Sequence, residues 1–160
     1  MNKKIANVSL IITNYNYSKF LSRCIDSCLN QSYENDFEVI FVDDGSTDES
    51  LKVASFYKQK GLRIISQENR GVESAANNGF RSAKGEYVLR IDADDYLHSD
   101  YLKKVIPIFH PNTSFVYSDY YIVDENSIIF DEMNLPDFDI SEIIRRGDFL
   151  ATGTTFRKSD

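Results

Sequence analysis

The 160-residue sequence lacks tryptophan and contains only two cysteines, two histidines and three prolines. It also lacks a long apolar run. The stretch from Val8 to Ile12 is far shorter than the ~18 residues that suggest a membrane span, and it is too short for the apolar region of a signal peptide. These absences predict a cytoplasmic chain without a membrane span, which as part of a longer protein could work at the inner face of the membrane.

Basic residues are fewer than acidic residues: the sequence contains 18 lysines and arginines and 25 aspartates and glutamates, which gives a formal net charge of −7. Proteins that bind the backbone of nucleic acids need a basic face, so nucleic acid is excluded as a partner. An anionic ligand would need a bound cation beside it. Cys24 and Cys28 stand four residues apart without a neighbouring histidine, which predicts buried reduced thiols rather than a zinc site.

The sequence has the composition of a globular domain. Apolar residues make up 42% of the chain, and a chain of this length buries roughly 68–70% of the surface that its unfolded form exposes. The sequence contains no linker, internal repeat or low-complexity tract. We therefore expect residues 1–160 to form a single domain.

Short β-branched runs alternate with amphipathic stretches in the first part of the chain. The runs predict four buried parallel strands, at residues 8–12, 38–42, 62–65 and 86–92. Three helices are expected between them: one capped by Ser18, one starting with a capping box of Ser46 and Glu49, and one from Val72 that ends at Gly85 in the left-handed conformation. The alternation predicts an α/β fold with right-handed crossovers and helices on both faces of the sheet.

The pattern changes after residue 96. We expect a helix over residues 99–106, a long strand over 114–123 and an antiparallel element near residues 124–130. A short helix near residues 140–145 and an extended segment over 149–156 complete the prediction. The sheet is therefore expected to be mostly parallel, with an antiparallel element after residue 110.

Polar clusters follow three of the predicted strands, at Thr13–Asn16, Asp43–Ser46 and Asp92–Asp95. The carboxyl ends of parallel strands meet at one edge of a sheet, and ligands of such sheets bind at that edge. The three clusters are therefore expected to form one site.

The cluster from Asp92 to Asp95 is the best candidate for a metal site. Mg²⁺ and Mn²⁺ prefer oxygen ligands, and Mg²⁺ is usually held by one or two carboxylates together with substrate phosphates. An Asp-x-Asp match alone is weak, because 16 aspartates in 160 residues produce about 1.6 matches by chance. The second match, Asp137-Phe138-Asp139, is interpreted as a solvated acidic turn. The first could likewise be only a polar loop.

Four segments, in this order and spacing, resemble the family 2 glycosyltransferases with a GT-A fold. They are Ile11-Ile12-Thr13-Asn14-Tyr15-Asn16, Val42 to Asp48, Asn69-Arg70-Gly71-Val72, and Lys84-Gly85-Glu86-Tyr87 leading to Asp92-Ala93-Asp94-Asp95. Ser118-Asp119 and the segment from Gly153 to Arg157 are similar to later parts of the family. The resemblance implies a Rossmann-like three-layer α/β sandwich.

The resemblance also implies an activity. The protein would transfer a sugar from a nucleotide-sugar donor, expected to be a UDP-sugar, to a hydroxyl of a saccharide or glycoconjugate acceptor. The transfer would invert the anomeric carbon, use Mg²⁺ or Mn²⁺, and serve polysaccharide or glycoconjugate synthesis.

Roles for individual residues follow from the same resemblance. Thr13 and Tyr15 would line the nucleoside pocket, with the Tyr15 ring stacked on the base, and Asp44 would accept a hydrogen bond from the imide N–H of uracil. Asp92 would lie near the ribose, and Asp94, supported by Asp95, would bind the metal. The plainer alternatives are that Tyr15 and Tyr17 only cover the first helix, and that Asp44 only supports its turn and the Ser46 cap.

Two departures from the family pattern bear on function. Many relatives carry an arginine where this chain has Ala76, so a donor contact is missing or is supplied by Arg70 or Arg81. No acidic residue matches the family's catalytic base, which is expected beyond Asp160 in an acceptor-binding part. The chain alone would then bind donor and turn it over slowly or not at all.

Two other classes of protein are alternatives to a glycosyltransferase. A non-catalytic nucleotide-sugar binding module fits the same binding residues. A phosphoacceptor receiver domain resembles the stretch from Val39 to Asp44, but its acidic pair would follow the first strand rather than the second. The receiver alternative is therefore excluded by position.

Overall fold

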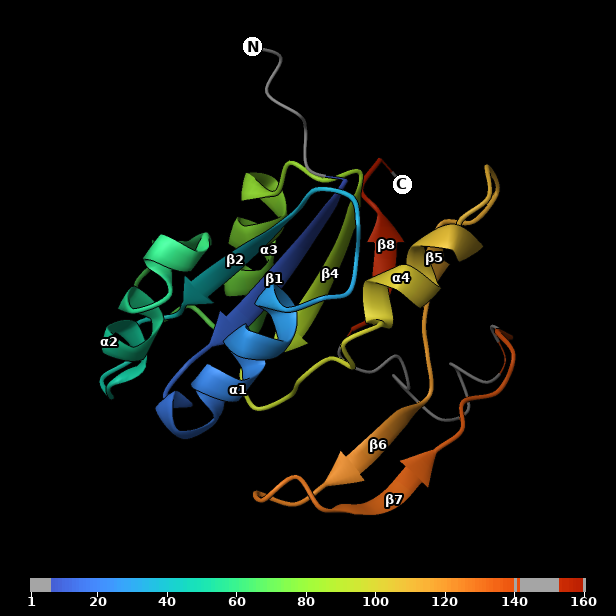
Figure 1. The fold of residues 1–160 in the computed structure, drawn as a ribbon. Coiled ribbons are helices and arrows are strands. Elements are labelled where there is room, and N and C mark those ends of the chain that lie inside the picture. The colour runs from blue at the N-terminus through green and yellow to red at the C-terminus, as the bar shows by residue number, and fades with distance from the viewer. Residues whose placement is uncertain (1–6, 140, 142–152, 160) are drawn as a thin grey trace.

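A six-stranded mixed sheet forms the centre of the protein, with the strand order β3-β2-β1-β4-β8-β5 (Figure 1). The structure, a computed structural model, describes residues 7–139, 141 and 153–159. Strands β1 to β4 are parallel, as predicted, and β8 runs antiparallel to its neighbours β4 and β5. The strands are β1 Val8–Asn14, β2 Phe37–Asp43, β3 Leu62–Ser66, β4 Tyr87–Asp92, β5 Phe115–Val116 and β8 Thr155–Arg157.

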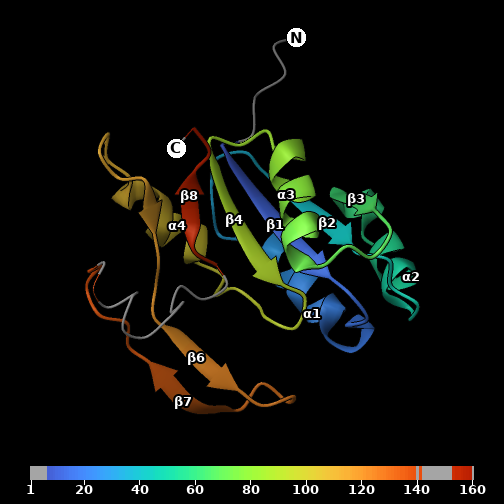
Figure 2. The same cartoon turned by 180° about the vertical axis from the view of Figure 1, so that it is seen from behind.

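Helices cover both faces of this sheet, as the two opposite views show (Figures 1 and 2). Side chains alternate between the faces along a strand, so Leu10 and Ile12 of β1 pack with Leu21 of α1, whereas Ile11 packs with Ala75 of α3. The predicted three-layer α/β architecture is thus confirmed. The helices are α1 Ser18–Leu29, α2 Ser50–Ser55, α3 Val72–Ser82 and α4 Tyr101–Val105, with the 3₁₀ turns η1 Lys58–Lys60 and η2 Ile106–Ile108.

Both predicted serine caps are wrong. Ser18 is the first residue of α1, and the cap position is Tyr17, which makes no side-chain cap hydrogen bond. Helix α2 begins only at Ser50, well after Ser46. The acceptor at both helix starts is Asp48, whose Oδ2 accepts a hydrogen bond from the Ser18 N–H and whose Oδ1 accepts one from the Ser50 N–H, each at 2.9 Å.

Gly85 does not end α3 in the left-handed conformation. The helix ends at Ser82, and the following Ala83 is extended. A Cβ atom on Gly85 would lie 2.6 Å from the backbone nitrogen of Ser9. The absence of a side chain therefore lets the chain enter β4 directly against β1.

The predicted long strand over residues 114–123 is also wrong, because the chain changes sheets within it. Strand β5 pairs with β8 in the main sheet, whereas β6 Tyr120–Val123 pairs antiparallel with β7 Ile129–Met133 in a separate hairpin. This hairpin confirms the antiparallel element expected after residue 110. The predicted helix over 140–145, apart from residue 141, and residues 149–152 of the predicted extended segment lie outside the described residues.

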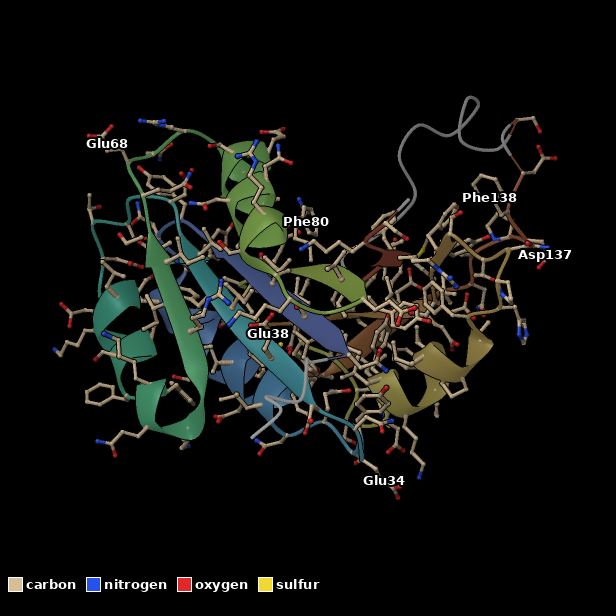
Figure 3. All side chains as sticks on the ribbon, turned by 90° about the horizontal axis from the view of Figure 1, so that it is seen from above. Glu34, Glu38, Glu68, Phe80, Asp137 and Phe138 are labelled. Atoms are coloured by element: carbon tan, nitrogen blue, oxygen red, sulfur yellow. The ribbon has the colours of Figure 1, made fainter. Side chains whose placement is uncertain are left out.

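The second Asp-x-Asp match is an exposed acidic turn, as predicted. Asp137, Phe138 and Asp139 are all exposed, and Asp139 Oδ1 accepts a hydrogen bond from the Ser141 N–H at 2.7 Å. Asp137 and Phe138 lie on the opposite side of the molecule from Glu68, which belongs to the segment after β3 (Figure 3). This acidic turn therefore does not contribute to the rim of the parallel strands.

Two predictions from composition can be compared with the fold. Cys24 and Cys28 are both buried and free, as predicted. Across the ranges that the structure describes, no helix has both the length and the apolar character needed to cross a membrane.

Candidate functional site

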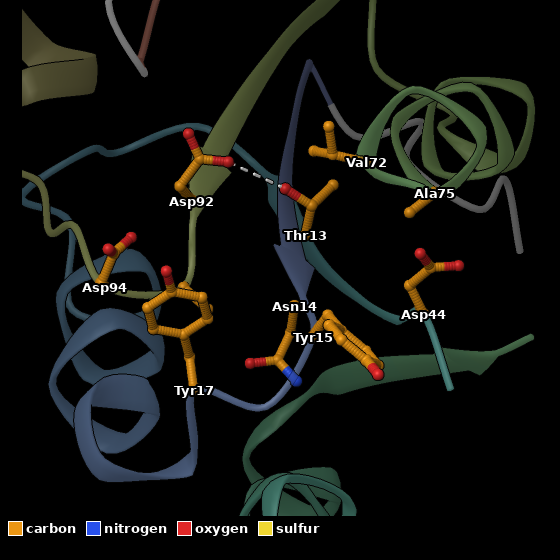
Figure 4. Close-up of a pocket in the computed structure, with 10 residues that line it drawn as sticks. Thr13, Asn14, Tyr15, Tyr17, Asp44, Val72, Ala75, Asp92 and Asp94 are labelled. Carbon is orange, nitrogen blue, oxygen red and sulfur yellow. Dashed lines mark hydrogen bonds between the residues drawn. The ribbon is translucent and has the colours of Figure 1, made fainter. Parts of the chain in front are cut away.

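The sheet register brings the three polar clusters together at the carboxyl ends of the parallel strands. Thr13 stands opposite Asp92 in the β1–β4 pair, and Asn14 stands opposite Asp43 in the β1–β2 pair. A pocket with a cavity volume of about 270 Å³ opens at this edge (Figure 4). It is lined by Thr13, Asn14, Tyr15, Tyr17, Asp44, Val72, Ala75, Asp92, Ala93 and Asp94. The predicted convergence of the strand ends is thus confirmed.

The end of β1 contributes a buried hydroxyl and an exposed ring. Thr13 is buried, and its Oγ1 donates a hydrogen bond to Asp92 Oδ1 at 3.1 Å. Tyr15 is 44% exposed and lines the pocket. Asn16, which follows, has a left-handed backbone with φ of 62°, and its Oδ1 accepts a hydrogen bond from the Thr47 N–H at 2.8 Å. The turn that presents Tyr15 is therefore fastened to the turn after β2.

Two adjacent aspartates at the end of β2 have different surroundings. Asp43 is fully buried, and its carboxylate accepts hydrogen bonds from Asn14 Nδ2 at 3.0 Å and from the Ser46 N–H at 3.1 Å. Asp44 faces the pocket and is only 2% exposed. Asp43, rather than Asp44, therefore supports the turn. The alternative that Asp44 serves only this turn and the Ser46 cap is wrong.

Asp44 holds the segment that connects β3 to α3. Its Oδ1 accepts hydrogen bonds from Gln67 Nε2 at 2.7 Å and from the Arg70 N–H at 2.9 Å, and its Oδ2 accepts one from the Gly71 N–H at 2.8 Å. Three donors converge on this carboxylate, and Oδ2, with a single donor, retains capacity for a further hydrogen bond. Gly45 permits the close approach of this segment, because a Cβ atom there would lie 2.7 Å from the Asn69 nitrogen.

The aspartates that the sequence predicts to bind a metal ion lie at the end of β4 and directly after it. Both carboxylate oxygens of Asp92 are engaged, Oδ1 with Thr13 and Oδ2 with Arg90 Nη2 at 2.9 Å. The Asp92 carbonyl also accepts a hydrogen bond from Cys24 Sγ at 3.6 Å. The pKa of this Cys24 thiol is raised well above its usual value by a hydrogen bond with Cys28 and by burial. Asp94 lines the pocket, whereas Asp95 is not among its lining residues.

Sequence reasoning missed some residues that complete this site. Val72 and Ala75, at the start of α3, form one wall of the pocket. Both lie in the helix that the sequence predicts from Val72, but the sequence gave no sign that the start of this helix borders a pocket. Gln67 orients Asp44, and only the sheet register could have revealed that contact. His98, the histidine that follows the cluster from Asp92 to Asp95 in the sequence, does not line the pocket, and its Nδ1 accepts a hydrogen bond from the Asp100 N–H.

The donor set at this edge fits a cation shared with a ligand rather than one held by the protein alone. Among the described residues, no group of three or more His, Cys, Asp or Glu side chains could hold a metal ion. Mg²⁺, however, is usually bound by one or two carboxylates, with substrate phosphates completing the coordination. The Asp94 carboxylate, on the open rim of the pocket, is a hard oxygen ligand of this type.

Comparisons with known proteins agree with this architecture. The sequence model of the family described as "Glycosyl transferase family 2" matches residues 9–155. The chain is 36% identical over 139 residues to chondroitin synthase of Escherichia coli and 35% identical over 140 residues to hyaluronan synthase of Pasteurella multocida. Each match covers 84% of this chain but only 20% and 14% of those proteins. The chain thus spans a small part of the length of such relatives.

Solved structures show the same fold. A mannosyltransferase from Pyrobaculum calidifontis, in complex with GDP-Man and Mn²⁺, superimposes with a TM-score of 0.65 and 27% identity over 72% of this chain and 36% of its own. The structure of Staphylococcus aureus TarS 1–349 has a TM-score of 0.66 and 24% identity over 96% of this chain and 47% of its own, a likeness of fold alone.

Proposed function

Since the chain belongs to glycosyl transferase family 2, we propose that it binds a nucleotide-sugar donor in the pocket at the carboxyl ends of β1, β2 and β4. The protein would transfer the sugar to an acceptor hydroxyl with inversion, in polysaccharide or glycoconjugate synthesis. One observation carries this proposal: Thr13, Asp44, Asp92 and Asp94 come from three separate strand ends and line a single pocket.

The nucleoside would occupy the part of the pocket between Tyr15 and Asp44. The Tyr15 ring offers a face on which a base can stack, a contact worth roughly 1–3 kcal/mol. Asp44 Oδ2 would accept a hydrogen bond from the imide N–H of uracil. Cytosine and adenine carry a ring-nitrogen acceptor in place of this donor, so Asp44 Oδ2 would face another acceptor and its remaining capacity would stay unpaired, which discriminates against them. Guanine carries a ring N–H, and the similar mannosyltransferase was solved with GDP-Man, so GDP is the rival to test.

The diphosphate would lie along the open rim, from Asp92 to Asp94. The two hydrogen bonds that Asp92 makes, with Thr13 and Arg90, would hold its carboxylate beside the ribose. Asp94, supported by Asp95, would hold Mg²⁺ or Mn²⁺, which supplies stabilisation of the negative charge on the leaving diphosphate. The Mn²⁺ in the complex of the similar mannosyltransferase supports a divalent cation in this role.

The general base belongs to the acceptor side of the reaction and is assigned to no aspartate of the pocket. Inverting transfer needs a base within hydrogen-bond reach of the acceptor hydroxyl. Asp44 and Asp92 already accept hydrogen bonds from protein donors, and Asp94 is proposed for the metal. Residues 1–160 are accordingly proposed as the donor-binding domain of the protein.

Calorimetric titration with UDP tests this proposal. We expect UDP to bind in Mn²⁺ and to lose at least tenfold in affinity, or ~1.4 kcal/mol, in EDTA or in the Asp94→Asn variant. Asp137→Asn, in the exposed second Asp-x-Asp match, is the matched control and should bind as the wild type does. GDP and ADP report the preference for the base. Equal UDP affinity in Mn²⁺, in EDTA and in Asp94→Asn would exclude a metal at Asp94, and no binding of any nucleotide would exclude the donor site.

A further inference from the structure

Helix α1 fastens the loop after β4 at three points. Cys24 Sγ donates to the Asp92 carbonyl, Arg23 Nη2 donates to the Asp94 carbonyl at 3.3 Å, and Ser27 Oγ accepts a hydrogen bond from the Leu97 N–H at 3.1 Å. In Figure 1 this loop, drawn in yellow-green, passes beside α1. The backbone on both sides of Asp94 is thus held by one face of a helix.

Arg23 is the member of this set that also contacts the β6–β7 hairpin. Its Nη1 donates to Ser127 Oγ at 2.6 Å, and its guanidinium lies 4.4 Å from the centre of the Tyr96 ring. Ser127, at the hairpin tip, has a left-handed backbone with φ of 67°. One turn earlier on α1, Lys19 forms an ion pair with Glu125 of the same tip. Figures 1 and 2 both show the tip directed towards α1.

We propose that Arg23 is a positioning residue, which sets the direction of the Asp94 carboxylate and links it to the β6–β7 hairpin. This inference rests on the proposed function, specifically on a metal ion at Asp94. A hydrogen bond to the Asp94 carbonyl fixes the peptide from which that side chain projects. The planar guanidinium can hold two acceptors in fixed directions while it stacks on a ring, which a lysine cannot do.

The size of the effect follows from what is known of groups that orient metal ligands. Loss of such a group typically reduces metal affinity 10–100-fold without removing the ligand itself. Arg23 does not line the pocket, and the three donors to Asp44 described above come from Gln67, Arg70 and Gly71. Its loss should therefore weaken only the metal-dependent part of nucleotide binding.

The test measures the Mn²⁺ gain, defined as the ratio of UDP affinity in Mn²⁺ to UDP affinity in EDTA. We expect Arg23→Gln to reduce this gain about tenfold while its UDP affinity in EDTA stays within twofold of the wild type. Arg23→Lys keeps the charge but not the planar set of N–H donors, so it should also lose most of the gain. Lys19→Gln, which removes the ion pair of α1 with Glu125 at the hairpin tip and leaves Asp94 untouched, is the matched control with an unchanged gain.

Three results would overturn this role for Arg23. The first is an unchanged gain in Arg23→Gln. The second is an equal loss of affinity in Mn²⁺ and in EDTA, which would mean that Arg23 only stabilises the fold. The third is full retention of the gain by Arg23→Lys, which would mean that charge alone acts. Absence of any Mn²⁺ gain in the wild type is a different failure, because it refutes the metal at Asp94 and the inference together.

Discussion

At the scale of single residues, aspartates that look alike in the sequence have different surroundings. Asp43 is fully buried within its own turn, Asp44 holds the segment before α3, and Asp92 is braced by Thr13 and Arg90. The sequence was sufficient to predict that these residues share one rim, because parallel strands end on the same side. It could not predict which oxygen atoms are already engaged, because the partners come from neighbouring strands and loops.

Asp44→Asn tests the residue that the proposal assigns to the base. The change replaces one carboxylate oxygen with an amide nitrogen, which would face Gln67 Nε2 or the Gly71 N–H. An unsatisfied buried donor costs about 1–3 kcal/mol, so the free energy of unfolding in urea should fall by about that amount. UDP affinity should fall at least tenfold in both Mn²⁺ and EDTA. Asp131→Asn, at an exposed position, should change the free energy of unfolding by no more than about 0.5 kcal/mol. If Asp131→Asn lost as much stability and UDP affinity as Asp44→Asn, the assignment of Asp44 to the base would be refuted.

At the scale of elements, periodicity located the strands and helices but not their ends. The amphipathic helix predicted after the first strand is confirmed as α1, in which Leu21, Cys24 and Cys28 are buried. The Ser46 cap was wrong because Ser46 Oγ accepts hydrogen bonds from the other strand end, including one from the Asn16 N–H at 3.0 Å. The Ser18 cap was wrong because Ser18 is already helical and its N–H donates to Asp48. Such contacts join turns that lie about thirty residues apart and leave no local signal.

Asp48 makes the junction of α1 and α2 sensitive to acid. Partial burial raises its pKa, but hydrogen bonds from Ser50 and Ser18 outweigh this effect and lower the pKa from 3.8 to about 2. Because the folded-state pKa is the lower one, the stabilisation is fully present above pH 3.8 and is lost as the pH falls through about 2. Asp48→Asn keeps only one acceptor oxygen, so one of the two N–H groups loses its hydrogen bond. At pH 7 this variant should therefore melt at a lower temperature than the wild type, and its free energy of unfolding should be smaller by roughly 0.5–1.5 kcal/mol, the net contribution of one hydrogen bond.

The pH dependence separates this effect from a general loss of packing. The difference in melting temperature between the wild type and Asp48→Asn should shrink between pH 4 and pH 2. A difference that stays constant over this range would contradict a charged acceptor at the two helix starts.

The strand predicted over residues 114–123 does not form as one element. Its two ends serve different sheets, because β5 pairs with β8 and β6 pairs with β7. Between them, Tyr117 donates a hydrogen bond to the Pro136 carbonyl at 2.6 Å, and Asp119 Oδ1 accepts one from the Leu135 N–H at 2.7 Å. A continuous run of strand-forming residues cannot reveal where a chain leaves one sheet for another.

At the scale of the whole molecule, a net charge of −7 has to be reconciled with an anionic ligand. Every titratable side chain that lines the pocket, apart from two tyrosines, is an aspartate. A cation between Asp94 and a diphosphate would remove this conflict, because a bound metal is then the largest local charge. The metal is therefore the point on which the proposed function depends most.

Paramagnetic line broadening by Mn²⁺ tests this point most directly. In two-dimensional amide spectra of the chain with UDP, substoichiometric Mn²⁺ should broaden the resonances of Ala93, Asp94 and Thr13 first, and leave Glu38 and Lys84, at the other end of the sheet, sharp. Addition of EDTA should restore the lost signals. Broadening centred on Asp131 or Asp137, or broadening spread evenly over the acidic surface, would contradict a metal-bound nucleotide at the carboxyl ends of the strands.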